Sequence, residues 1–140
     1  MGGPRRYLAF YLLSGMGGAA MYLLLWAGGV LVTDATVPLV GASAGIFGIL
    51  IAGAMIAPNT TVMLLFPPIP MKLKVFALIL LGLAIWAVLF QGDNAGGQAA
   101  HLGGAAVGAA LARYPRVLDV FDKWPPRRKR RRFFMDDPRR

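Results

Sequence analysis

Apolar and polar residues alternate along this chain in long blocks, with four hydrophobic runs separated by shorter polar segments. The runs cover residues 7–32, 40–57, 75–90 and 95–112. A helix needs about 20 apolar residues to cross the hydrocarbon core of a bilayer. The fourth run, rich in Gly and Ala, is the least hydrophobic of the four. The pattern therefore predicts an all-α fold, a polytopic transmembrane helical bundle with four spans.

The segments between the runs carry turn signals. Short polar turns with one aspartate each occupy residues 33–38 and 91–94, whereas the connection at 59–74 is longer and rich in proline. The apolar piece at residues 62–66 is too short to cross a membrane. We expect it to lie at the membrane interface.

Composition agrees with a membrane protein of one domain. The chain has 140 residues, 57% of them hydrophobic, and a mean hydropathy of +0.60. A soluble domain of this size has mostly surface to cover and cannot be so apolar. There is no cysteine, which excludes disulfides and thiolate metal sites.

The net charge of +9 is unevenly distributed and predicts the topology. Basic residues occur in the lead before residue 7, in the 59–74 connection, and after residue 112. Because cytoplasmic segments carry the excess of Lys and Arg, four spans with both ends cytoplasmic are expected. Residues 116–140 form a basic cytoplasmic tail, which we interpret as an anchor on anionic lipid rather than a nucleic-acid site.

Two polar residues inside the apolar runs are the candidates for chemistry. Ser43 stands at the head of the second run, and His101, the only histidine, lies in the fourth. On the predicted topology both lie near the outer ends of their helices. A serine hydroxyl becomes a nucleophile when a base takes its proton, and histidine is the usual base. No carboxylate is placed to orient His101, so the pattern indicates a Ser–His dyad.

Small residues predict that the second and fourth helices touch. They line one face of each run: Gly41, Gly45, Gly48 and Ala52 on the second, and Ala100, Gly104, Gly108 and Ala112 on the fourth. Such faces allow helix backbones to approach closely in a membrane. His101 shares the face of Gly104 and Gly108, so we expect it to look across this contact.

Other interpretations of the same residues remain open. A serine in a membrane helix usually packs or bonds a backbone carbonyl, and an intramembrane histidine can be structural, although an ionisable group there is a functional hypothesis by default. Gly41-x-Ser43-x-Gly45 also fits the nucleophile elbow of soluble hydrolases, but that elbow needs a large α/β sheet. The basic start and first run could form a signal peptide, although apolar residues continue past the possible cleavage site.

Several segments together resemble the rhomboid family of intramembrane serine proteases. They are Arg6–Gly15, Gly41–Gly48, the proline-rich Leu65–Pro70, and Ala100–Gly104 with Gly108. The resemblance covers roughly residues 5–115, hence a rhomboid-like membrane domain at 1–115. It implies that Ser43 is the nucleophile, His101 the general base, and Phe47 an aromatic packed on the imidazole. It also implies that the helix head around Gly41 and Ser43 contributes to the oxyanion hole, with Gly104 supporting the site.

The chain departs from the family pattern in two places. Ala44 follows the serine where the family usually has glycine, and the chain begins where the family's third helix begins. The first two helices, with the second helix's His/Asn oxyanion contributors, then either lie upstream or are missing in a truncated relative. Losing an oxyanion donor costs about 10²–10³ in rate, so this chain alone is expected to be weak or inactive.

The resulting expectation is a serine endopeptidase that needs no metal or cofactor. It would cleave transmembrane protein substrates near the outer face of a membrane, taken to be a bacterial inner membrane. The alternative is a catalytically inactive rhomboid-like fragment or pseudoprotease that binds membrane helices through the same small-residue faces. A channel component is less favoured, because the spans carry no carboxylate or polar stripe to line a path.

Overall fold

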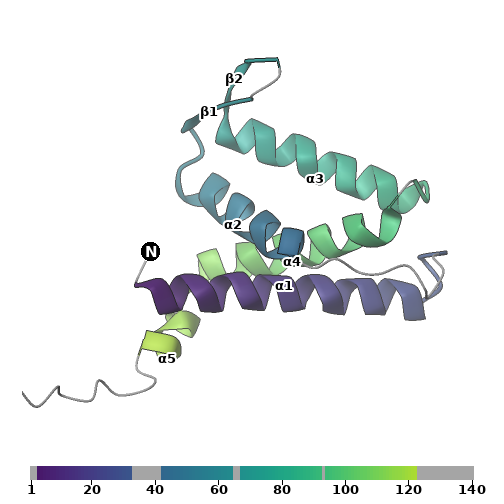
Figure 1. The fold of residues 1–140 in the computed structure, drawn as a ribbon, viewed down its shortest axis with the longest axis horizontal. Coiled ribbons are helices and arrows are strands. Elements are labelled where there is room, and N and C mark those ends of the chain that lie inside the picture. The colour runs from purple at the N-terminus through teal and green to yellow at the C-terminus, as the bar shows by residue number, and fades with distance from the viewer. Residues whose placement is uncertain (1–2, 33–41, 65–66, 93, 123–140) are drawn as a thin grey trace, which may run out of the picture.

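The computed structural model describes residues 3–32, 42–64, 67–92 and 94–122 of the chain (Figure 1). Most of these residues are helical, as the sequence predicts. The four long helices are α1 (Pro4–Ala27), α2 (Ala42–Ile56), α3 (Leu73–Leu89) and α4 (Ala95–Arg113). A 3₁₀ turn, η1 (Pro115–Leu118), and a short helix, α5 (Asp119–Asp122), follow α4. Gly41, which the sequence analysis included in the site, lies outside the described residues.

By length and composition, one described helix, α1, is long and apolar enough to cross a bilayer. The apolar helices α2 and α3 have 15 and 17 residues, and α4 has 19 but is less hydrophobic. At 1.5 Å per residue, α2 is roughly 22 Å long, shorter than a hydrocarbon core of ~30 Å. The predicted four-span arrangement is therefore not established by the helices themselves.

The first helix ends earlier than the hydrophobic run suggests. Pro4 occupies the first turn, where its missing N–H and fixed φ suit a helix start. The helix stops at Ala27, five residues before the predicted end, because Gly28 caps it and Gly29 adopts a φ of +71°. A positive φ suits glycine and turns the chain. The following residues fold back, and the Val30 and Leu31 amides donate to the Leu25 carbonyl.

The connection between α2 and α3 contains a β-hairpin that the sequence analysis treated as a loop. Strand β1 (Thr61–Met63) pairs antiparallel with β2 (Pro70–Lys72), with Val62 opposite Met71. Strands of three residues are too short to give a recognisable alternation of apolar and polar positions. Of the proline-rich segment, Pro67 and Pro68 lie between the two strands and Pro70 begins β2.

The helix α4 lies at the centre of the bundle and contacts α1, α2 and α3 (Figure 1). One core cluster joins α1, α2 and α4 to η1: Ala9, Phe10, Ala52, Leu111 and Leu118. A second joins the residues after α1 to α3 and α4: Leu31, Val88, Ala95 and Ala99. Many large apolar side chains, including Leu78 and Leu83 of α3, remain exposed. Such an apolar exterior fits a bilayer better than water.

Packing continues past residue 115, into the segment that the sequence analysis assigned to the tail. Leu118 is buried against the α1–α4 core. The Arg6 guanidinium donates to the Pro115 carbonyl at 3.1 Å and pairs with the Asp119 carboxylate at 2.6 Å. Residues 115–122 thus fold back onto the first turns of α1, beneath the bundle in Figure 1.

Candidate functional site

Ser43 and His101 lie together although 58 residues separate them. Ser43 is in the first turn of α2, and His101 is in the second turn of α4. The Ser43 hydroxyl is 2.9 Å from His101 Nε2, a hydrogen-bonding distance. Ser43 is exposed and His101 is partly buried, so the pair lies at an accessible edge of the bundle. The proximity expected from the sequence is present in the fold.

Glycine at two positions of α4 brings the two helices close enough for this contact. A Cβ on Gly104 would overlap the Ala44 backbone, and one on Gly108 would overlap the backbone of Gly48. Only a residue without a side chain allows main chains to approach this closely. The absence of a side chain at Gly104 therefore allows the close α2–α4 approach one turn from His101.

The predicted small-residue face of α2 divides between two neighbours. Gly48 faces α4 and also Ser14 of α1, whereas a Cβ on Gly45 would meet the ring of Tyr11 in α1. The Tyr11 hydroxyl donates a hydrogen bond of 3.1 Å to the Ala42 carbonyl, directly before Ser43. Sequence reasoning placed the whole stripe against the fourth helix and missed this tyrosine. Tyr11 ties the head of α2 to α1.

Phe47 packs on the imidazole as the resemblance implied. Its ring centroid lies 4.9 Å from that of His101, with an angle of 3° between the two planes. Phe47 is one turn below Ser43 on α2 and is buried. A stacked ring restricts rotation of the imidazole while leaving both nitrogens at its edge available for hydrogen bonds.

Gln98 provides the second hydrogen bond to His101. Its side-chain oxygen lies 3.0 Å from His101 Nδ1, one turn earlier on α4. A carbonyl oxygen only accepts, so Nδ1 carries the hydrogen in this arrangement and Nε2 presents its lone pair to the Ser43 hydroxyl. The sequence analysis looked for a carboxylate and overlooked this amide, although a spacing of three residues places side chains together on a helix.

The start of α4 is fixed by polar contacts of the preceding turn. Asn94, in a left-handed conformation with φ of 60°, accepts a hydrogen bond of 3.2 Å from the Gly97 amide and caps the helix. Gln91 donates through Nε2 to the Val30 carbonyl and accepts from the Val32 amide. These bonds attach the α3–α4 turn to the segment after α1 and so fix the turn of α4 that carries His101.

Two further features bear on the chemistry of the site. The first four amides of a helix lack carbonyl partners within it, and Ser43 lies in that turn of α2. Such amides can stabilise negative charge on an oxygen. Across the described ranges, no three His, Cys, Asp or Glu side chains gather into a possible metal site.

The apolar exterior of the helices is that of a helical membrane protein. The serine that is hydrogen-bonded to a stacked histidine gives this protein a candidate nucleophile–base pair. The chain belongs to the rhomboid family, since a family model for the Rhomboid domain matches residues 1–116. Membership makes it an integral membrane protein of a family that acts on transmembrane substrates within the bilayer. Neither curated proteins nor solved structures gave a significant match.

Proposed function

We propose that this protein is an intramembrane serine endopeptidase that uses Ser43 and His101 as a catalytic dyad. The observation that carries the proposal is the 2.9 Å contact between the Ser43 hydroxyl and His101 Nε2. When His101 Nδ1–H donates to the Gln98 side-chain oxygen, Nε2 has a free lone pair, which is the tautomer that a general base needs. Family membership supports the same chemistry.

The proposed reaction has two steps. His101 Nε2 takes the Ser43 proton while the serine oxygen attacks the scissile carbonyl, and amides at the head of α2 stabilise the oxyanion. The imidazolium then returns its proton to the leaving amine as the C–N bond breaks, which leaves an ester on Ser43. Water, deprotonated by the same Nε2, hydrolyses that ester and releases the acid product. Ser43 and His101 are regenerated.

The proposed topology has α1 to α4 crossing the membrane with both termini of the chain in the cytoplasm. Arg5 and Arg6 lie in the first turn of α1, Lys72 and Lys74 flank the start of α3, and Arg113 ends α4. The positive-inside tendency puts all of these on one side. Ser43 and His101 then lie toward the opposite, outer face, where they would meet transmembrane substrates.

Active-site labelling provides the test, because the chain contains only two serines, Ser14 and Ser43. A fluorophosphonate probe should label the wild type and the control Ser14→Ala, whose hydroxyl is buried in α1. Ser43→Ala and His101→Ala should abolish labelling. Cleavage of a transmembrane substrate should fall by up to ~10⁶ in kcat, as for other serine nucleophiles.

Two outcomes would contradict the proposal. Labelling that survives Ser43→Ala would place the reactive group elsewhere. A well-folded wild type without labelling or cleavage, which still binds transmembrane helices equally well after either substitution, would favour the pseudoprotease alternative.

A further inference from the structure

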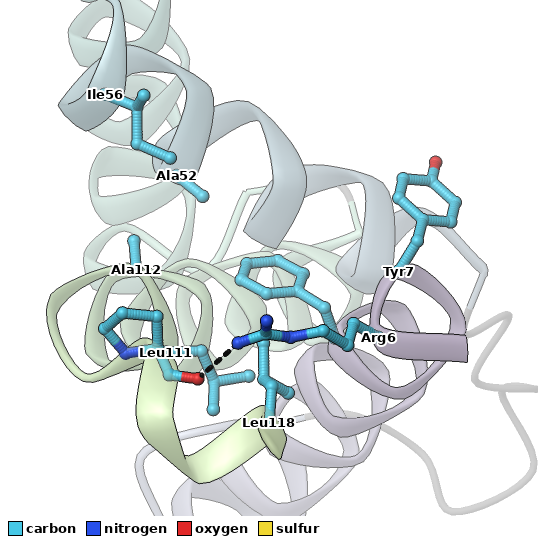
Figure 2. Close-up of a pocket in the computed structure, with 9 residues that line it drawn as sticks. Arg6, Tyr7, Ala52, Ile56, Leu111, Ala112 and Leu118 are labelled. Atoms are coloured by element: carbon cyan, nitrogen blue, oxygen red, sulfur yellow. Dashed lines mark hydrogen bonds between the residues drawn. The ribbon is translucent and has the colours of Figure 1, made fainter. Parts of the chain in front are cut away.

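A cavity of about 430 Å³ (Figure 2) is lined by residues at the end of the bundle opposite the Ser43–His101 pair. It opens between the first turns of α1, the last turns of α2 and α4, and η1. Its size falls within the range of small-molecule sites, about 300–1,000 Å³. Nothing in the proposed proteolytic chemistry uses it.

The cavity has an apolar floor and an accessible rim. Its floor consists of buried side chains from three helices and η1: Phe10, Ala52, Leu111 and Leu118. Tyr7 and Ile56 at the rim are about half exposed or more, at 50% and 64%. The floor would accept a hydrocarbon chain, and the exposed rim gives that chain a way in from the side.

One wall of the cavity is cationic. The Arg6 guanidinium lies across it beside Leu118, oriented by its bond to the Pro115 carbonyl (Figure 2) and its ion pair with Asp119. The described side chains at this end include four arginines, Arg5, Arg6, Arg113 and Arg116, and the carboxylate of Asp119. The end of the bundle is therefore net positive and attracts an anionic group.

We propose that this cavity binds one phospholipid with an anionic headgroup, its acyl chain on the apolar floor and its phosphate beside Arg6. The occupant follows from the combination of surfaces. A hydrocarbon floor alone would accept any lipid, and arginines alone would attract any anion. An apolar floor and a guanidinium in one cavity match a molecule that has both an acyl chain and an anionic group. Basic cavities between helices on the cytoplasmic side are suited to such headgroups.

The test measures lipid retention by native mass spectrometry. The full chain in detergent is supplied with dioleoyl phosphatidylglycerol or dioleoyl phosphatidylcholine, and the retained lipid per protein is compared. The wild type should retain one phosphatidylglycerol in preference to phosphatidylcholine. Arg6→Gln should lower this retention about five-fold, the effect of one basic residue at an anionic surface. The control Arg113→Gln, a basic residue outside the cavity, should lower it less.

Two further variants separate the cavity from the surface around it. Ala112→Leu should displace the lipid by filling the cavity, whereas Ala110→Leu, the same change at an exposed position of α4 outside it, should not. Asp119→Asn removes the Arg6 ion pair but keeps the guanidinium charge, so retention should be maintained or rise. Helical circular dichroism confirms that each variant is folded.

Each contrary result overturns the proposal in a distinct way. Equal retention of the two lipids would remove the role of charge. Equal losses in Arg6→Gln and Arg113→Gln, or indifference to Ala112→Leu, would indicate general attraction to a basic surface rather than a cavity. Loss in Asp119→Asn as large as in Arg6→Gln would mean that Arg6 acts by holding α5. Binding of inorganic phosphate as tightly as phosphatidylglycerol would show that the acyl chain contributes nothing to binding.

Discussion

The central helix α4 meets its neighbours in two different ways. Toward α2 the contact is made by backbone, with Gly104 and Gly108 against the main chain of Ala44 and Gly48. Toward α3 it is made by side chains, with Val88 in a cluster with Ala95 and Ala99. Gly82, in the middle of α3, has open space where a Cβ would stand. The candidate site lies on the first contact.

The difference shows which interhelical distance in this fold must be set closely, namely that between α2 and α4. A backbone contact leaves the distance between helices less freedom than a side-chain contact does, because no side chain can adjust. A hydrogen bond of 2.9 Å between helices, as between Ser43 and His101, depends on that distance. The outer helix α3 exposes most of its large side chains, and its contact with α4 is made by side chains, which can adjust.

The sharpest test of the comparison is the same substitution on both helices. Gly104→Ala inserts a methyl group into the Ala44 backbone, and overpacking of this kind lowers the free energy of unfolding by about 1–3 kcal/mol. Gly82→Ala meets nothing and should raise it by roughly 0.5–1 kcal/mol, since alanine is the better helix former. Unfolding by dodecyl sulfate in mixed micelles measures both. Equal effects would refute the distinction between the two contacts.

A smaller effect is expected from Gln98, which acts on the site through His101. Gln98→Leu removes the acceptor for Nδ1 and should lower kcat about ten-fold, the value of one hydrogen bond of roughly 1–1.5 kcal/mol, with KM unchanged. Gln98→Glu keeps an acceptor and should restore kcat. Cleavage kinetics with a transmembrane substrate measure the two variants.

The pair of variants separates positioning from packing. If Gln98→Leu and Gln98→Glu lose activity together, the glutamine acts through the fold of α4. A loss confined to Gln98→Leu, with unfolding unchanged, is the signature of a residue that sets the imidazole tautomer.

Much of the helical framework could be predicted because hydrophobic runs report which residues avoid water. Runs report ends poorly: the first continued to residue 32, but Gly28 and Gly29 stop the helix at Ala27. The hairpin around Val62 and Met71 is too short for a pattern. Residues 116–122 were assigned to the tail because their charges conceal one buried residue, Leu118.

Some residues of the candidate site could be found from the sequence, whereas others are recognised only from the packing of the helices. Ser43 and His101 could be singled out because hydroxyl and imidazole groups are unusual in apolar runs. Their partners could not, because Tyr11 reaches the Ala42 carbonyl from a third helix and nothing in the order of residues indicates which face of α1 meets α2. Gln98 could have been found, because it lies three residues before His101 on the same helix. An amide side chain, however, indicates a partner for histidine less strongly than a carboxylate does.

The smallest expected effect is for a substitution on the exposed face of α3. Leu83 of α3 is 56% exposed, so Leu83→Ala should change the free energy of unfolding by no more than about 0.5 kcal/mol. Buried leucines lose about 2–5 kcal/mol on the same change because a cavity remains. Leu111, 8% exposed in the α1–α2–α4 core, provides the matched control. Should Leu83→Ala prove as costly as Leu111→Ala, this face of α3 must be covered in the membrane by protein, and α3 would be an inner helix of a larger assembly.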